Sequence, residues 1–324
     1  MSYLSITNLT KIYNEEKVVD QISFTIEKGI KLGIAGETGA AKTTVLKLIA
    51  GLLQPDSGQI FLNEVKVEGP EDRLLPGHPA IGYLSQHFEL RNNYRVEEEL
   101  EMASNMDASE TSRIVSICKI SHLLKRKTNA LSGGERQRIV LAKTLVKKPS
   151  LLLLDEPFSN LDPAHKSQMK DVLCELASTL SITMILVSHD GSDLLSWADD
   201  LIVIQKGKIV QRGTPEALFS NPADTYTAGL LGPFNRIDEA DFILLKPIFL
   251  KNLPASFPII LRPSQLTLAI HDQAGVLATI CKSSFMGGYW LVQVLIVEKL
   301  ITVQSVKAPP MPGSRVWVSL LQSL

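Results

Sequence analysis

The sequence predicts an α/β domain with a helical insertion, followed by a small all-β domain. Three observations support this fold class. An apolar run over 30–35 leads through a glycine-containing loop into a helical run over 45–49, which is the order of a phosphate-binding loop. The continuously apolar runs 151–154 and 183–187 are typical of parallel strands buried on both faces. From about residue 232, short apolar runs alternate with turn residues, as in a β-barrel or sandwich.

Length, charge and composition limit the classes of function. The chain has 324 residues, enough for one large and one smaller domain with separate cores. Its net charge of −1 gives no reason to expect nucleic acid as a partner, which would require a basic surface. The three cysteines lie far apart and fit a reducing compartment, with neither a disulfide framework nor a metal site. We expect no signal peptide and no membrane-spanning segment.

The amino-terminal segment is predicted to form two strands before the loop. Residues 4–9 alternate between apolar and polar side chains, and 18–26 is again strand-like. Tyr13 lies between them. By pattern alone it is a half-buried strand aromatic.

The loop from Gly36 to Thr44 has the chemistry that phosphate binding requires. Successive backbone N–H groups that lead into a helix concentrate donors and positive dipole on one point. Lys42 adds a full positive charge, and the Thr43 hydroxyl can bind Mg²⁺. The usual pattern has glycine before the lysine, whereas this chain has Ala41. If residue 41 is left-handed, alanine costs roughly 1 to 2 kcal/mol, or about tenfold in affinity.

After the loop helix, the chain is predicted to return to the sheet and then leave it. Residues 59–62 and 80–86 read as strands, and Gln86 ends the second of them. An amide at that place is compatible with an ordinary strand end. The segment from about 88 to 130 is mostly helical and charged, so we predict a helical insertion there. Its clearest periodic stretches are 96–102 and 112–124.

The insertion ends at Leu-Ser-Gly-Gly-Glu, residues 131–135, which precede an apolar helical run over 139–145. Ser132 and Glu135 have the spacing of a capping box, so an ordinary helix start is one interpretation. Two consecutive glycines are more than a cap requires, and they leave N–H groups of the first turn exposed. The motif therefore predicts a second anion site.

Polar residues follow both buried strands of the predicted sheet. Asp155 and Glu156 end the first strand, where carboxylates are unfavourable unless they face a cation or a polar ligand. His189 follows the second strand; alone, it reads as an ordinary strand-end residue. Ligands of open α/β sheets bind at the carboxyl ends of the strands. A helix over 164–180 and a hairpin over 201–210 complete this domain.

The rest of the chain is predicted to be all-β, with no helix after about residue 232. It contains no nucleotide motif and no recognisable pair of carboxylates, so we interpret it as a binding or regulatory module. Its apolar runs are 259–261, 266–270, 277–281, 289–297, 301–306 and 316–320.

In this order, the motifs resemble the ATP-binding subunit of an ABC transporter, and the resemblance covers nearly the whole chain. It implies a P-loop NTPase (ABC ATPase) domain over 1–231, with a helical subdomain at about 88–130. A C-terminal OB-like regulatory (TOBE) domain is implied over 232–324. Glu135 stands where the family signature has glutamine. The matching motifs are Walker A (Gly36–Thr44), Walker B (Leu151–Asp155), the signature (Leu131–Glu135) and the D-loop (Ser159–Asp162).

The resemblance also implies roles for single residues, with ATP and Mg²⁺ as cofactors. The catalytic residues would be Glu156, His189, Lys42 and Gln86. The metal would be held by Thr43, Gln86 and Asp155. ATP would be bound within one chain by Tyr13, which stacks on adenine, and by Gly36, Glu37, Thr38, Gly39, Ala40, Ala41, Lys42, Thr43 and Thr44. A second subunit would complete the site with Ser132, Gly133, Gly134, Glu135 and Asp162.

The carboxyl-terminal part resembles importer ATPases, through Gly213-Thr214-Pro215-Glu216 and Leu261-Arg262-Pro263. The implied function is ATP-driven dimerisation and hydrolysis that energise import through separate membrane subunits. The expected partners are a second copy or a paired ABC subunit, integral membrane permeases and a solute-binding protein, without nucleic acid. The expected location is the cytoplasm, peripheral on the inner face of the cell membrane.

Two alternatives remain at this point. A non-transporting ABC protein that acts on ribosomes or DNA is disfavoured, because there is one nucleotide domain and no long coiled-coil insertion. A nucleotide sensor with little turnover is motivated by Ala41 and Glu135 together. It is disfavoured because Lys42, Glu156 and His189 are all present.

Overall fold

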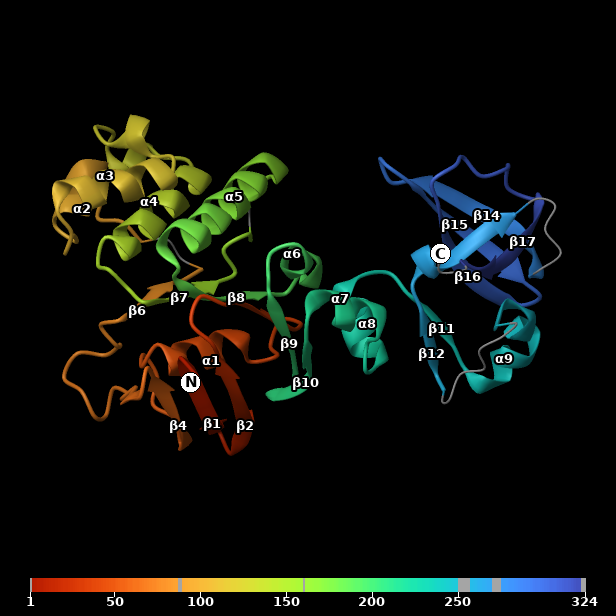
Figure 1. The fold of residues 1–324 in the computed structure, drawn as a ribbon, viewed down its shortest axis with the longest axis horizontal. Helices are drawn as coiled ribbons and strands as arrows, with labels where there is room; N and C mark the ends of the chain where they lie inside the picture. Colours follow the sequence, from red (N-terminus) through yellow and green to blue (C-terminus); the bar gives the residue numbers. More distant parts are fainter. Residues whose placement is uncertain (1, 87–88, 160, 250–256, 270–274, 322–324) are drawn as a thin grey trace. The chain divides into compact units, whose positions relative to one another are not determined.

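The computed structural model describes residues 2–86, 89–159, 161–249, 257–269 and 275–321 (Figure 1). It divides into two compact units, residues 1–218 and 219–324. The predicted domain boundary at 231/232 therefore lies within the second unit. Residues 88, 160 and 270, where we expected the start of the insertion, part of the D-loop and the end of a strand, lie outside the described residues.

The first unit is built on a mixed sheet whose strands lie in the order β10 (Lys208–Gly213), β9 (Asp200–Gln205), β3 (Lys31–Ala35), β8 (Thr183–Ser188), β7 (Leu151–Asp155) and β6 (Ile81–Leu84). All neighbours are parallel except the edge strand β10, which is antiparallel to β9. Every residue of β7 and β8 is buried, which explains their continuously apolar sequences. The carboxyl ends of β3, β7 and β8 meet at one edge.

A second, antiparallel sheet has the order β2 (Glu16–Ile26), β1 (Leu4–Tyr13), β4 (Ser57–Leu62) and β5 (Val65–Lys66). Helix α1 (Lys42–Ile49) lies between the two sheets (Figure 1). Its buried Leu46 shares one core with Ile6 of β1 and Ile185 of β8. This packing on both sides fixes the amino terminus of α1 beside the carboxyl ends of the parallel strands.

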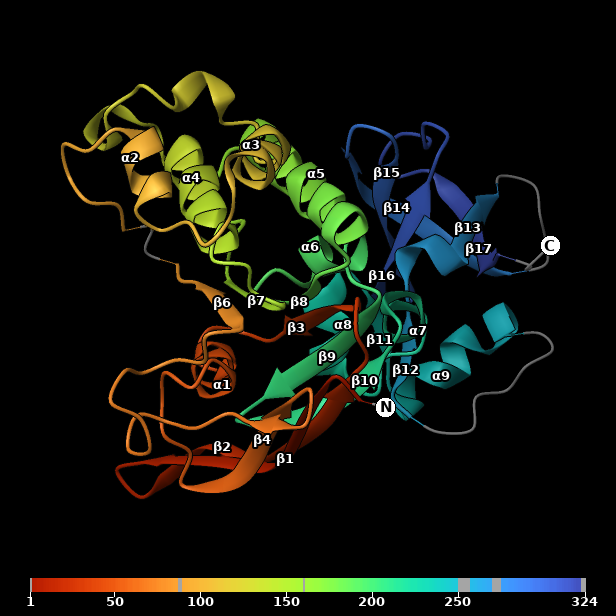
Figure 2. The ribbon, with the colours of Figure 1, turned by 60° about the vertical axis from the view of Figure 1, so that its left-hand side comes forward.

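The predicted helical insertion is present and is grouped with α4 and α5 in Figure 2. Its helices are α2 (Val96–Glu101) and α3 (Ala108–Ile117), which are followed by α4 (Gly133–Leu145) and α5 (Pro163–Leu180). The fully buried Glu99 of α2 is paired with Lys143 of α4 and with Arg91, whose Nε lies 3.1 Å from the Glu99 Oε1. Two cations compensate the buried carboxylate, which would otherwise be strongly unfavourable.

The expected helix over 112–124 is wrong at both ends. Helix α3 begins earlier, because Asp107 caps it through the Glu110 N–H at 2.8 Å. It ends at Ile117, because Lys119 adopts a left-handed conformation with φ of 54°, and a short 3₁₀ turn at Ser121–Leu123 follows.

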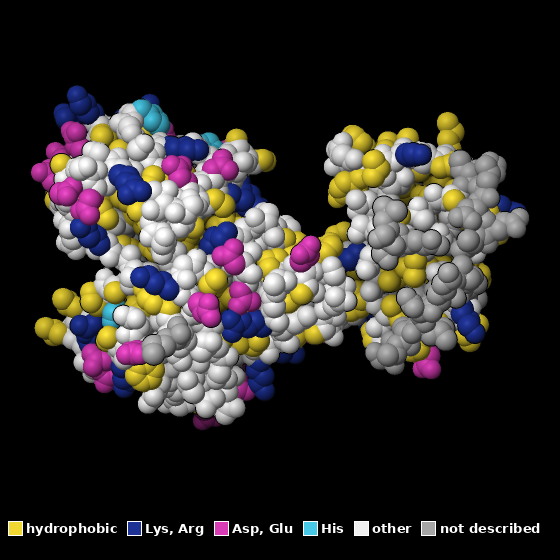
Figure 3. Space-filling view, viewed as in Figure 1, with side chains coloured by type: hydrophobic (Ala, Val, Ile, Leu, Met, Phe, Trp, Pro, Cys, Tyr) yellow, Lys and Arg dark blue, Asp and Glu magenta, His cyan; other side chains and the backbone are white. Residues whose placement is uncertain are grey.

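Three short helices complete the first unit and begin the second. They are α6 (Gly191–Leu195), α7 (Pro215–Ser220) and α8 (Thr225–Leu231). Within the described ranges, no helix is both long and apolar enough to cross a membrane. On the face drawn in Figure 3, acidic and basic side chains are interspersed over the first unit.

The second unit contains the predicted antiparallel sheets, which confirm the fold class. One pairs β11 (Asn235–Ile237) with β12 (Ile259–Leu261); the other has the order β13 (Leu266–Ala269), β17 (Arg315–Leu320), β14 (Val276–Phe285), β15 (Trp290–Ile296) and β16 (Lys299–Ser305). The expectation that helical structure stops near residue 232 is wrong. Helix α9 (Glu239–Leu245) follows Asp238, and its acidic first turn suits the helix dipole. Asp241 of α9 pairs with Lys299 of β16.

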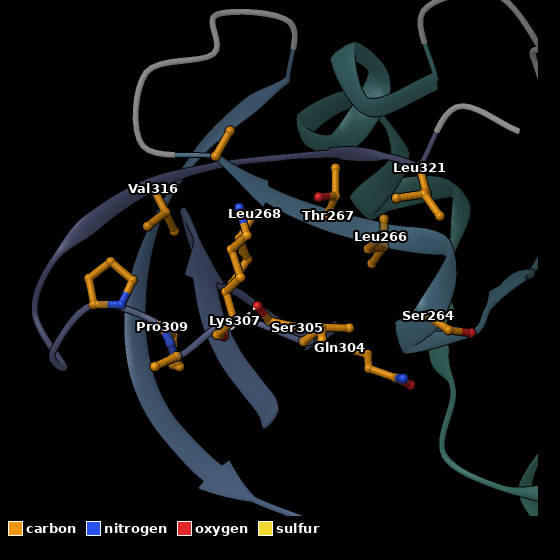
Figure 4. A pocket seen from close by; sticks show the side chains of 14 residues that line it. Ser264, Leu266, Thr267, Leu268, Gln304, Ser305, Lys307, Pro309, Val316 and Leu321 are labelled. Carbon is orange, nitrogen blue, oxygen red and sulfur yellow. Dashed lines mark hydrogen bonds between the residues drawn. The ribbon is translucent and has the colours of Figure 1, made fainter. Parts of the chain in front are cut away.

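The second unit also holds a buried arginine and a cavity. Arg262 is 2% exposed and donates to the carbonyl oxygens of Phe219, Ala228, Gly232 and Pro233, which ties the end of α8 to β12. The cavity has a volume of about 450 Å³ and is lined mainly by β13 and residues 304–310, with Val316 of β17 (Figure 4). Its walls are mostly apolar, and Lys307 is the one cation among the described lining residues.

Candidate functional site

The phosphate loop connects the end of β3 to α1, as predicted. Its backbone requires unusual conformations at Gly39, with φ of 87°, and at Ala41, with φ of 83° and ψ of 13°. A Cβ at Gly36 would lie 2.6 Å from the carbonyl oxygen of Ile204, so only glycine fits there. Ala41 is the residue before α1 and gives no side-chain cap. The N–H groups of the first turn of α1 are therefore available to an anion.

Lys42 is the buried cation of this loop. It is 5% exposed, and its Nζ donates to the carbonyl oxygens of Gly36 at 2.8 Å and Glu37 at 3.0 Å. Burial lowers the pKa of the Lys42 amine, and the nearby carboxylates of Glu156, Asp155 and Glu37 act in the opposite direction. A further anion beside Lys42 would favour the charged amine in the same way.

Asp155 lies at the end of β7 and is 3% exposed. The Thr43 hydroxyl donates to its Oδ1 at 2.9 Å, so two of the residues predicted to hold a metal are in contact. The Tyr83 hydroxyl, from β6, donates to its Oδ2 at 2.8 Å. Burial, and then the Asp155 carboxylate, raise the pKa of Tyr83, which keeps this hydroxyl protonated. We did not predict a role for Tyr83. The sequence signal that could have indicated it is a tyrosine within an otherwise apolar strand.

Glu156 and His189 meet across the ends of β7 and β8. The Nδ1 of His189 lies 2.8 Å from the Oε2 of Glu156, and the Nζ of Lys42 lies 3.9 Å from its Oε1. Glu156 has φ of 49°, a conformation that non-glycine residues adopt rarely and often at functional sites. The Ser159 hydroxyl, which donates to the carbonyl oxygen of Glu156 at 2.8 Å, helps to hold this conformation.

The signature residues lie at the start of α4. The predicted capping box is present: the Ser132 Oγ accepts from the Glu135 N–H at 3.3 Å, and the Glu135 Oε2 accepts from the Ser132 N–H at 2.8 Å. This N–H lowers the pKa of Glu135. A Cβ at Gly134 would lie 2.7 Å from His165 of α5, whereas one at Gly133 would meet no described atom within 4 Å. The first turn of α4 is thus open on the side of Gly133.

Other predicted residues lie apart from the Lys42, Asp155 and Glu156 contacts. Asp162 caps α5 through the His165 N–H at 3.0 Å. Tyr13, at the end of β1, is 45% exposed, with the Nζ of Lys11 5.4 Å from its ring centroid. Gln86 is exposed after β6. The structure therefore clusters the loop and Walker B residues with Glu156 and His189, and it places the signature and D-loop residues on separate helix termini.

We also missed Gln137. Its buried side chain, from α4, donates to the carbonyl oxygen of Pro157, one residue after Glu156. This bond connects the helix that begins with the signature motif to the strand end that carries the two carboxylates. No local pattern in the sequence indicates it, since the two residues are 20 positions apart.

Together, the fold and this cluster define an ATP-binding ATPase domain with a phosphate loop on a mixed sheet and a helical insertion. A family model described as ABC transporter matches residues 19–159. The chain belongs to the ABC transporter family, as an ATP-binding subunit of the importer type that couples ATP hydrolysis to transport.

Individual relatives and one solved structure support this assignment. The chain is 37% identical over 248 residues to the glucose import ATP-binding protein GlcV of Saccharolobus solfataricus, with 74% of this chain and 70% of that protein covered. It is 35% identical over 281 residues to the Fe(3+) ions import ATP-binding protein FbpC 2 of Haemophilus influenzae, covering 82% and 79%. The structure of CbiO1 from Clostridium perfringens, described as part of the ABC transporter complex CbiONQ, matches with a TM-score of 0.60 and 26% identity. That match covers 67% of this chain and 90% of CbiO1. The names of these three proteins all refer to transport, so they do not favour the alternative of a non-transporting ABC protein.

Proposed function

We propose that two copies of this chain, or one copy and a paired ABC subunit, enclose ATP and Mg²⁺ between them and drive solute import through separate permease subunits. The position of Glu156 carries this proposal, because its carboxylate lies between Lys42 of the phosphate loop and His189, which follows β8. A carboxylate in that place can accept a proton from a water molecule that attacks the γ-phosphate. A solute-binding protein would deliver the solute to the permeases.

The phosphate loop would hold the nucleotide, with Tyr13 stacked on adenine. The Lys42 amine and the N–H groups of the first turn of α1 would neutralise the β- and γ-phosphates. His189 would contact the γ-phosphate and keep Glu156 oriented through its 2.8 Å contact. Gln86, exposed at the end of β6, would connect the nucleotide to the membrane partner.

Asp155 at the end of β7 and Thr43 of α1 fit Mg²⁺. The Thr43 hydroxyl and the Asp155 carboxylate are oxygen donors 2.9 Å apart, and Mg²⁺ prefers oxygen ligands from one or two side chains, phosphates and water. In the parts of the chain that the structure describes, no three His, Cys, Asp or Glu side chains form a metal cluster. When bound, Mg²⁺ would neutralise phosphate charge; Gln86 would be a further ligand.

The other half of the site would come from the second subunit. Ser132, Gly133 and Gly134 would present the open first turn of α4 to the γ-phosphate, and Glu135 and Asp162 would flank it. Association with permeases would place the dimer on the cytoplasmic face of the membrane.

The shared site is tested by mixing two inactive variants. Glu156→Gln removes the carboxylate of one half-site, and Ser132→Arg blocks the other. If the sites form between subunits, an equimolar mixture regains about a quarter of the wild-type ATPase rate per chain, because about half of the dimers are mixed and each mixed dimer holds one intact site of two. A mixture that stays as inactive as the separate variants contradicts the proposal. Pull-down of the permeases identifies the membrane partner.

Ala41→Gly is expected to leave the ATPase rate unchanged or to raise ATP affinity by up to about tenfold, because alanine in a left-handed conformation costs roughly 1 to 2 kcal/mol. The gain in folding free energy is smaller, since glycine also stabilises the unfolded chain by about 0.4 to 1 kcal/mol. ATP titration and thermal unfolding measure both effects. Ala40→Gly is the matched control and gains nothing, because residue 40 has no positive φ. A large loss in Ala41→Gly would show that the loop is adapted to alanine.

Tyr83→Phe is expected to raise the Mg²⁺ concentration for half-maximal hydrolysis by about tenfold, because one hydrogen bond to the Asp155 carboxylate is lost. The affinity for ATP without metal stays unchanged. Binding of Mn²⁺, followed by electron paramagnetic resonance, reports the same weakening without turnover. Tyr289→Phe removes a hydroxyl from the second unit and is the control. An unaltered Mn²⁺ affinity in Tyr83→Phe would exclude this role.

A further inference from the structure

We propose that Arg126 is a positioning residue that neutralises Glu135, so that the start of α4 can accept the γ-phosphate of an ATP molecule held by the second subunit. This inference rests on the proposed function, since it concerns the half-site that α4 would contribute. It explains how this chain can have a charged residue, Glu135, at a position where the family signature has neutral glutamine.

The contacts of Glu135 use both of its carboxylate oxygens. Its Oε2 accepts from the Ser132 N–H at 2.8 Å, as the capping box requires. Its Oε1 lies 3.3 Å from the Nη1 of Arg126. The Glu135 side chain is 19% exposed and that of Arg126 is 54% exposed. The carboxylate is thus held at the first turn of α4, and the cation reaches it from the solvent side.

A negative charge at this place opposes the proposed function. The amino terminus of a helix attracts anions through its free N–H groups and its dipole. The Glu135 carboxylate already occupies part of that positive field, and it would repel an incoming phosphate. Glutamine could make the same capping contact without the charge. With glutamate, the first turn of α4 can favour a phosphate only if a cation cancels the carboxylate.

Arg126 is the cation in position to do this. Arg138 also lies near Glu135, but its side chain is buried at 4% exposure and its Nη1 donates to Gln168 at 2.8 Å. Arg136 instead donates to the carbonyl oxygen of Thr128. Arg126 contacts the Glu135 carboxylate directly.

The backbone of Arg126 is fixed. Its N–H donates to the carbonyl oxygen of Leu123 at 2.8 Å, and its own carbonyl oxygen accepts from the Val96 N–H at 3.0 Å. The guanidinium therefore extends from a short connection that is anchored to the start of α2. Exposed ion pairs add little to folding stability, so the expected effect of this pair is on the charge that α4 presents, and hence on nucleotide binding between subunits.

The test measures ATP-driven dimerisation in the Glu156→Gln background by light scattering, at low and at high salt. At low salt, Arg126→Ala is expected to raise the ATP concentration for half-maximal dimerisation by about tenfold, and this effect shrinks at high salt because the charges are screened. Glu135→Gln alone leaves that concentration equal or lower. The double variant Arg126→Ala/Glu135→Gln returns to within about twofold of Glu135→Gln, because no uncompensated charge remains.

Lys148→Ala is the matched control. It breaks an exposed pair on the same helical part, in which the Lys148 Nζ lies 2.7 Å from the Glu110 Oε2, and it leaves dimerisation unchanged. If the double variant is as impaired as Arg126→Ala, Arg126 acts through the fold and the charge proposal is overturned. If Arg126→Ala dimerises like the Glu156→Gln background alone, the proposal is also wrong. If the Glu156→Gln background itself forms no dimer with ATP, the shared site of the proposed function fails, and this inference fails with it.

Discussion

Glu156→Gln is expected to lower the rate of ATP hydrolysis by about 10²- to 10⁴-fold, the contribution of a positioned general base. Glutamine keeps the size of the side chain but cannot accept the proton of the attacking water. The Lys42 and His189 contacts to this side chain indicate that it is held at one place. Since ATP binding does not need the carboxylate, we expect an ATP-bound dimer to accumulate. Phosphate release and size-exclusion chromatography with ATP measure the two effects.

The control for this variant is Glu110→Gln, which changes an exposed glutamate of α3 that pairs with Lys148. It should hydrolyse ATP at the wild-type rate. Turnover within about threefold of the wild type in Glu156→Gln would refute the catalytic assignment, because such a factor is far below the effect of a general base. His189→Ala should also slow hydrolysis, since it removes the neighbour that orients Glu156.

Lys42→Ala is expected to weaken ATP binding by about 10²-fold or more, because two or more charge-assisted hydrogen bonds to phosphate are lost at about 1.5 kcal/mol or more each. The amine is held by the Gly36 and Glu37 carbonyl oxygens, so it is in place before the nucleotide arrives. Calorimetric titration with ATP measures the affinity.

Lys47→Ala is the matched control for Lys42→Ala. Lys47 lies in the last turn of the same helix α1 and is exposed, so its removal changes the net charge equally without touching the loop. It should bind ATP as the wild type does. An affinity of Lys42→Ala within about threefold of that of Lys47→Ala, under 0.7 kcal/mol, would show that the loop amides alone hold the phosphates.

The phosphate loop shows what can be predicted from residues that are neighbours in the sequence. The spacing from Gly36 to Thr44 predicted the loop because its glycines, lysine and following helix are consecutive in the chain. Whether Ala41 would be strained depended on its φ of 83°. That angle is a property of the folded loop, because alanine by itself disfavours a left-handed conformation.

The second unit shows the same difference between features that local sequence predicts and features that depend on the folded chain. Strands at 259–261 and 316–320 were predicted because alternation and turn residues are local signals. Helix α9 was missed because its apolar run is too short to show a helical period, and its Asp241 finds Lys299 only in the folded chain. The end of α3 was also missed, because the left-handed residue after it is a lysine, Lys119, and not the glycine that would have marked the turn.

The sequence by itself determined the class of fold, the phosphate loop, the two buried strands with their terminal Asp155, Glu156 and His189, and the resemblance to ABC ATPases. Each of these depends on residues that are close together in the chain. Only the tertiary structure decided that Tyr83 contacts Asp155, that Gln137 contacts Pro157, and that Arg126 contacts Glu135. These contacts join separate elements, and side-chain pairs of that kind form only after the strands and helices have packed.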